Sequence, residues 1–138
     1  MKRDDAITWI KNAALVFPPL HREVHTWAMK RSEGAYSTER WSRACATFHE
    51  KHKELAFPGG WYLARARLRS GDQDALEYAL CFVEIRPYFF HTGYMFTALV
   101  KCLNSVPMTT AQRARYERVK AEYLEYTRKK SLSRVDAR

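Results

Sequence analysis

The sequence predicts an all-α protein of about seven helices, stacked as helical hairpins, with a compact helical bundle as the alternative. Apolar residues recur at helical spacing along the chain, and no segment alternates apolar and polar residues for long enough to indicate a strand. The five glycines and five prolines stand mostly where helices would have to stop. We therefore expect a helix content above about 60%, against roughly one third in typical globular domains.

The length and composition predict one domain. A chain of 138 residues, 46% of them hydrophobic, is long enough to bury a single core. We assign residues 1–130 to one helical domain. Residues 131–138 form a basic tail with too few apolar residues to pack, and we expect this tail to be disordered.

Two helices are predicted in the first third of the chain. The first runs from about Asp5 to Val16 and ends at Pro18-Pro19, because proline lacks the amide that an interior helical position donates. The second runs from about Pro19 to Gly34. Its apolar residues lie at i, i+4, i+7 and i+8, namely Leu20, Val24, Trp27 and Ala28.

The third helix is predicted to begin near Ser37 or Thr38, since either side chain can cap a helix N-terminus. It ends before Pro58. Its predicted buried stripe consists of Trp41, Ala44, Cys45, Phe48 and Leu55.

The fourth and fifth helices form a pair joined by a tight turn. The fourth runs from about Trp61 to Ser70 and stops at Gly71. Asp72 or Asp74 then caps the fifth, which ends before Pro87. Capping explains these two carboxylates without any catalytic role.

The last two helices have the clearest boundaries. The sixth covers roughly Thr92 to Leu103. Thr109 and Gln112 have the spacing of a capping box, which predicts that the seventh helix starts there and runs to about Lys130.

A repeat of 34 residues relates apolar positions in successive helices. It pairs Trp27 with Trp61, Cys45 with Ala79, Phe48 with Phe82, and Leu55 with Phe89. Periods of this size are typical of helix–turn–helix repeats, whose units must stack to bury their apolar faces.

The segment from Trp61 to Leu103 resembles a degenerate tetratricopeptide repeat. The residues that carry the resemblance are Trp61, Leu63, Ala64, Gly71-Asp72, Ala75, Ala79 and Pro87. The second helix of the unit is one residue short, and Arg67 stands where an aromatic residue is common. The resemblance implies a short superhelix with a concave groove that binds a peptide or a partner protein.

The chain is basic, with a formal charge of +9, and residues 108–138 carry nine Lys/Arg against four Asp/Glu. A basic surface attracts nucleic acid, anionic lipid or an acidic protein. The candidates for contact with nucleic acid or an acidic partner are Arg65, Arg69, Arg113, Arg115, Arg118 and Lys120. Tyr and Trp side chains are available to stack on bases.

The cysteines and the hydropathy indicate the compartment. Cys45, Cys81 and Cys102 lie far apart on apolar stripes and are expected to be buried free thiols. No apolar run has the length of a signal peptide or a membrane span, so we expect a cytoplasmic protein that does not enter a membrane.

Four histidines are weak candidates for a metal site. His21 and His25, and likewise His49 and His52, share one helical face at spacings of four and three. Neither pair forms an HExxH motif, and neighbouring Arg and Lys residues oppose a cation. Solvated or structural histidines are the favoured interpretation, with no bound metal or cofactor.

Arg43 and His49 are weak catalytic candidates. Their spacing resembles the Arg-x4–6-His motif of the small helical ribonucleases of bacterial conflict systems, although Ala44 stands where a polar residue is usual. The resemblance implies ribonuclease activity. A motif without its structural context is a weak hypothesis.

Pro87 to Tyr94 contains four aromatic residues. Tyr88, Phe89 and Tyr94 are candidates for lining a partner groove if they are exposed, while burial of the cluster in the core is favoured.

The function predicted from these features is that of a non-enzymatic helical binding module, an adaptor or accessory subunit for an acidic partner protein. The first alternative is an accessory protein that binds RNA or DNA. The second is a ribonuclease that uses Arg43 and His49.

Overall fold

The computed structural model describes residues 1–136, of which 83% are helical, and no strand occurs among them. This confirms the all-α class. The elements are α1 (Arg3–Lys30), a 3-10 turn η1 (Arg31–Glu33), α2 (Ala35–Leu55), α3 (Trp61–Arg69), α4 (Gln73–Ile85), α5 (Thr92–Leu103) and α6 (Thr110–Asp136).

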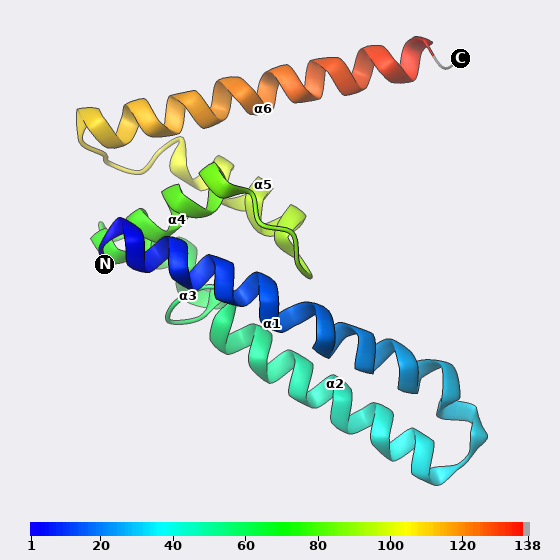
Figure 1. The fold of residues 1–138 in the computed structure, drawn as a ribbon. Helices are drawn as coiled ribbons and strands as arrows, with labels where there is room; N and C mark the ends of the chain where they lie inside the picture. Colours follow the sequence, from blue (N-terminus) through cyan, green and yellow to red (C-terminus); the bar gives the residue numbers. More distant parts are fainter. Residues whose placement is uncertain (137–138) are drawn as a thin grey trace.

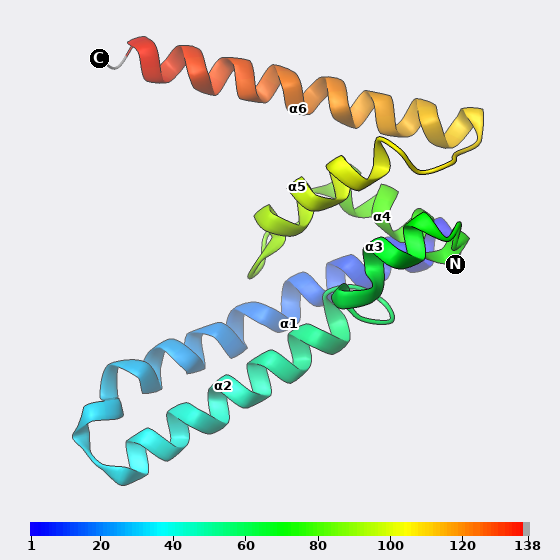
Figure 2. The same ribbon diagram turned by 180° about the vertical axis from the view of Figure 1, so that it is seen from behind.

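The helices form a central body from which two segments extend, the far part of the α1–α2 hairpin below and the far part of α6 above (Figure 1). Helices α1 and α2 make a long antiparallel hairpin whose far end projects from the body, and the view from behind shows the same arrangement (Figure 2). Helix α4 packs against α1, α3, α5 and α6 and is the centre of the core. Its buried residues are Ala75, Leu76, Tyr78, Ala79, Leu80, Cys81, Phe82 and Val83.

The predicted break at Pro18-Pro19 is wrong, because both prolines lie inside the continuous helix α1. The first half of this helix buries Ala6, Ile10 and Ala13 in the core, and Phe17 continues the same stripe up to the prolines. Packing against α2 and α4 therefore outweighs the two missing amide donors.

Helix α2 begins earlier than the sequence predicted, with Gly34 as its N-cap. The hydroxyl of Thr38 donates to the carbonyls of Arg31 (2.6 Å) and Gly34 (3.0 Å), so it stabilises the hairpin turn and does not cap the helix. In the outer part of the hairpin Trp41 and Cys45 are only half-buried, whereas Phe48, nearer the body, is buried. In the outer part α1 and α2 pack against each other, so their side chains are covered on one side and are less buried.

The predicted boundaries of the next elements are close to those observed. Asp72 caps α4 by accepting a hydrogen bond from the amide of Ala75 (3.0 Å). Thr109 and Gln112 form the reciprocal bonds of a capping box (2.9 and 3.2 Å) at the start of α6.

Helix α6 extends to Asp136, past the predicted end at Lys130. Residues 131–136 of the predicted disordered tail are thus helical, while residues 137 and 138 lie outside the described part of the chain. Tyr116 and Val119, in the first half of α6, are buried against the body, whereas Tyr126 in the second half is 50% exposed and contacts the body through Arg86 (5.2 Å). None of the described helices is both long and apolar enough to cross a membrane.

The 34-residue repeat aligns the hairpin of α1 and α2 with the hairpin of α3 and α4, but the two hairpins differ in length. Phe48 and Phe82, which it aligns, are both buried in α2 and α4. Helix α2 has 21 residues and α4 has 13, and Leu55 ends a helix whereas Phe89 lies in a loop. The likeness to a tetratricopeptide repeat therefore remains a resemblance of apolar positions.

Candidate functional site

A hollow with a volume of about 680 Å³ opens between the end of α2, the start of α3 and the start of α5. It is lined by His49, His52, Lys53, Gly59, Gly60, Trp61, Tyr62, Leu63, Arg65, His91 and Tyr94. Six of these eleven side chains carry a ring, and none is acidic.

The floor of the hollow depends on the turn between α2 and α3. Gly59 and Gly60 have φ of 80° and 94°, a conformation that side chains disfavour. The buried ring of Phe57 anchors this turn against Tyr78, at a centroid distance of 4.7 Å. Arg67 clamps the turn by donating to the carbonyl of Pro58. Trp61 and its neighbours on α3 are thereby held at the hollow.

His52 lies at the inner side of the hollow and is half-buried. Its ring packs near Phe17 (5.3 Å) and Phe90 (5.6 Å), and its Nε2 lies 3.1 Å from the carbonyl oxygen of Phe90. A carbonyl only accepts hydrogen bonds, so Nε2 carries the proton in the neutral ring and Nδ1 has the free lone pair. Burial lowers the pKa of His52 below the ordinary 6.5, and His91 and His49 lower it further against the raising effect of the Phe90 bond.

His91 stands on the opposite side, at the N-terminus of α5. Its backbone is left-handed, with φ of 72°, which is unusual for a residue other than glycine. Its ring lies 5.8 Å from that of His52 and 5.7 Å from that of Tyr94, between centroids. The turn before α5 thus brings a second imidazole, which is exposed, to the first.

The basic surface continues beyond the hollow along α3 and α5. Arg65 and Tyr94 also line a neighbouring depression, whose other residues include Arg69 and Lys101. Lys53, Arg65, Arg69 and Lys101 form no ion pair within the described residues. We call this continuous surface the basic aromatic groove. It offers unpaired cations to an anionic ligand.

The predicted basic residues of α6 are divided between the interior and the surface. Arg113 donates to the carbonyls of Leu103 (3.2 Å) and Val106 (2.8 Å), and Arg115 forms ion pairs with Glu77 (2.9 Å) and Glu84 (2.6 Å). Although burial opposes the charge of Arg115, its bonds to the two carboxylates raise the pKa above the ordinary value. Arg118 is exposed and Lys120 is partly exposed. Arg113 and Arg115 are thus structural, and the predicted basic stripe on α6 is reduced to two residues.

The three predicted groove aromatics also have different environments. Phe89 is only 8% exposed and packs on Phe17 at 4.8 Å, so this ring belongs to the core, as favoured for the cluster, and does not line a groove. Tyr94 is 55% exposed and lines the groove. Tyr88 is 93% exposed but lies outside the hollow.

The predicted metal candidates do not converge. In residues 1–136 no three His, Cys, Asp or Glu side chains lie close enough together to hold a metal ion. His21 and His25 are exposed on α1, and the ring of His21 contacts that of Phe48 at 5.6 Å. His49 and His52 both line the hollow.

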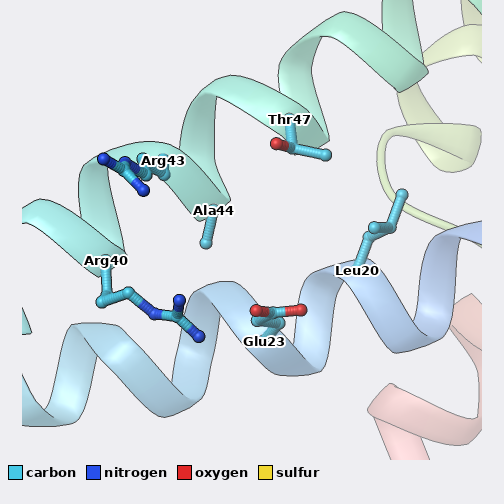
Figure 3. A pocket seen from close by; sticks show the side chains of 6 residues that line it. All are labelled: Leu20, Glu23, Arg40, Arg43, Ala44 and Thr47. Atoms are coloured by element: carbon cyan, nitrogen blue, oxygen red, sulfur yellow. The ribbon is translucent and has the colours of Figure 1, made fainter.

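The weak ribonuclease pair is not assembled either. Arg43 lines a small hollow of about 130 Å³ between α1 and α2, together with Glu23 and Arg40 (Figure 3). It pairs with Glu39 on its own helix at 2.6 Å. His49 lies in the other hollow, so the two candidates belong to separate surfaces of α2.

The three cysteines are free thiols, but only Cys81 and Cys102 are buried, whereas Cys45 is half-buried. Burial, reinforced by Glu77, raises the pKa of Cys81 to about 11. A thiol with so high a pKa is a poor nucleophile.

Four residues of the groove had no sequence pattern to mark them, namely Lys53, Tyr62, His91 and Lys101, and Trp61 was marked only as a core residue of the repeat. His91 is a lone histidine beside a predicted helix start, and Tyr62 falls on the polar side of α3. The one available signal was the pair of aromatic residues, Trp61 and Tyr62, directly after the Pro-Gly-Gly turn.

Comparison of the chain with protein-family models, curated proteins and solved structures finds no significant match.

Proposed function

We propose that the protein is a binding module for single-stranded nucleic acid, which it takes up in the basic aromatic groove. The observation that carries the proposal is the lining of the hollow, which brings six ring-bearing residues together with Lys53 and Arg65 and includes no carboxylate. Proteins that bind single strands combine such stacking platforms with a positively charged path.

The rings are accessible for stacking. Tyr62 is 94% exposed, and Tyr94 shares the hollow with Trp61, whose ring lies 6.3 Å from that of Tyr94. Every base has a π-face, so stacking on tyrosine and tryptophan is tolerant of sequence. The unpaired cations Arg65, Arg69 and Lys101 continue from the rings and would follow the phosphates of the same strand.

The second candidate is the adaptor function, in which the groove takes an acidic segment of a partner protein. The observation that favours it is Leu63, which is 57% exposed in the hollow and offers an apolar anchor beside the cations. Apart from Leu63 the hollow has no aliphatic side chain, which is why the nucleic-acid proposal is preferred.

The test is fluorescence anisotropy with labelled single-stranded oligonucleotides at several salt concentrations. Tyr62→Ala should weaken binding by about tenfold, because stacking contributes about 1–3 kcal/mol per base. Arg65→Gln should reduce the slope of log affinity against log salt by about 0.7. Tyr88→Ala is the matched control, since Tyr88 is as exposed as Tyr62 but lies outside the hollow.

The same titration with poly-glutamate separates the two candidates. Binding of poly-glutamate without binding of oligonucleotides would contradict the nucleic-acid proposal and favour the adaptor function. Equal effects of Tyr62→Ala and Tyr88→Ala would show that the groove is not the binding surface.

A further inference from the structure

We infer that the groove also cleaves RNA, by attack of a ribose 2′-hydroxyl on the adjacent phosphorus, with His52 as general base and His91 as general acid. This inference rests on the proposed function and narrows its ligand to RNA. It differs from the Arg43–His49 hypothesis in site, residues and mechanism.

The geometry supplies two imidazoles at one opening. His52 comes from α2 and His91 from the start of α5, and their ring centroids lie 5.8 Å apart. The attacking and leaving oxygens of this reaction lie on opposite sides of a single phosphorus. The base and the acid must therefore lie within about one phosphodiester group of each other, and the two rings satisfy this.

His52 has the properties of a base. Its Nε2–H is held by the carbonyl of Phe90, which leaves Nδ1 as the basic nitrogen. Burial among aromatic rings keeps the pKa of His52 below 6.5, so the ring is neutral at pH 7. The charged or titratable groups that line the hollow around it are His49, Lys53, His91, Arg65 and the phenols of Tyr62 and Tyr94.

His91 has the properties of an acid that can exchange protons with solvent, because it is exposed at the rim. Its backbone is left-handed, with φ of 72°, and strained conformations of this kind cluster at functional sites. The conformation keeps the ring between those of His52 and Tyr94.

The reaction balances without a further reactant. The 2′-hydroxyl proton passes to Nδ1 of His52 as the 2′-oxygen bonds to phosphorus. The bond from phosphorus to the 5′-oxygen breaks, and this oxygen keeps the electron pair and takes a proton from His91. The products are a 2′,3′-cyclic phosphate and a 5′-hydroxyl. Lys53 and Arg65 are placed to stabilise the negative charge on the phosphoryl oxygens.

The experiment uses the full chain, in EDTA, with one labelled RNA oligonucleotide and the same sequence as DNA, which lacks the 2′-hydroxyl. Binding of the DNA and cleavage of the RNA are measured on the same protein samples. Wild type should bind both and cleave only the RNA, with a cyclic phosphate identified by mass spectrometry. The rate should fall as pH drops through the pKa of His52, which burial holds below the ordinary 6.5, because His52 must be neutral to accept the proton.

His91→Gln should lower the cleavage rate by about 100-fold or more, since acid–base catalysis contributes at least that much. It should change affinity for the DNA by less than about threefold. His52→Gln should have the same effect, with its melting temperature measured because the ring is half-buried. His25→Gln, on the exposed surface of α1 outside the hollow, is the control and should cleave at the wild-type rate.

Three outcomes would contradict the cleavage inference, and one of them would also contradict the proposed function. If wild type binds the DNA but leaves RNA intact, the cleavage inference fails and the proposed function stands. If His91→Gln cleaves as fast as wild type, the activity does not come from this site. If neither oligonucleotide binds, the proposed function fails as well.

Discussion

The arginines of α3 and the arginines of α6 have the same chemistry but opposite roles. On α6, Arg115 is enclosed by Glu77 and Glu84, and Arg113 is bonded to two backbone carbonyls. On α3, Arg65 and Arg69 are exposed in the groove and form no ion pair within the described residues. The arginines differ because of what each helix faces. Helix α6 covers the side of α4 that carries Glu77 and Glu84, whereas the side of α3 that carries Arg65 and Arg69 faces the groove.

Helix α3 alone contains arginines of both kinds, structural and exposed, at three alternate positions. Arg67, between Arg65 and Arg69, pairs with Asp72 at 2.9 Å and clamps the turn at Pro58. The formal charge therefore overstates the number of cations that are available to an anionic ligand. The useful quantity is the number of cations that no carboxylate or carbonyl engages.

The largest effect on stability is expected from Arg115→Gln. The substitution leaves the partly buried Glu77 without its cation and Glu84 with only the longer contact to Arg3 (3.8 Å), so the free energy of unfolding should fall by about 2–3 kcal/mol. Urea denaturation measures this. Arg118→Gln on the exposed side of the same helix should change stability by less than about 0.5 kcal/mol. Equal losses in the two variants would remove the distinction between interior and surface arginines.

A smaller effect is expected at Asp72. Its bonds from the Ala75 amide and from Arg67 hold the pKa of its carboxyl below the ordinary 3.8. A lowered folded-state pKa means that the stabilisation is complete above about pH 4 and is lost as pH falls through the folded-state value. Asp72→Ala should cost about 1 kcal/mol at pH 7.

The contribution of the charge at Asp72 can be separated from that of the cap. Asp72→Asn keeps a good helix cap, so it should recover part of the loss and flatten the dependence of stability on pH in the acid range. Thermal unfolding between pH 2 and 7 tests both variants. An unchanged acid dependence in Asp72→Asn would show that the charge of this carboxylate does not stabilise the fold.

Arg65→Gln combined with Arg69→Gln should leave stability within about 0.5 kcal/mol of wild type, because both side chains are exposed. Binding should respond instead. The slope of log affinity against log salt should fall by about 1.4, as expected for two lost phosphate contacts on a single strand. A substitution of Arg113 and Arg115 that reduced this slope while the protein stayed folded would contradict the division of roles.

The smallest effect is expected from deletion of residues 131–138. Residues 131–134 are exposed on the part of α6 that extends beyond the body, so the free energy of unfolding should change by less than about 0.5 kcal/mol. Denaturation of the shortened chain measures it. A loss above about 1 kcal/mol would indicate that this end of α6 has a packing partner.

Local signals in the sequence predicted much of the fold. Helix α5 has the predicted bounds, and the capping residues Asp72 and Thr109 act as expected, because a helix end is determined by a few neighbouring residues. The break at Pro18-Pro19 was wrong because tertiary packing decided the outcome there. Long-range contacts of this kind leave no local pattern.

The candidate site was less predictable for the same reason. Arg65, Arg69 and Tyr94 were identified from charge and aromatic content, and the structure places them on one surface. His52 was singled out for metal, whereas its observed neighbour is His91, 39 residues later in the chain. A pairing across two helices depends on the fold as a whole.

The two prolines inside α1 have a consequence for how the molecule opens. The carbonyls of Ala14 and Leu15 lack the amide donors that would normally come four residues later, at Pro18 and Pro19. The ladder of helical hydrogen bonds is thus interrupted where the hairpin leaves the core. We expect amide hydrogen exchange to divide the chain at this point. The outer hairpin, whose apolar residues are only half-buried, should exchange by local unfolding, while α4 exchanges only when the whole domain unfolds.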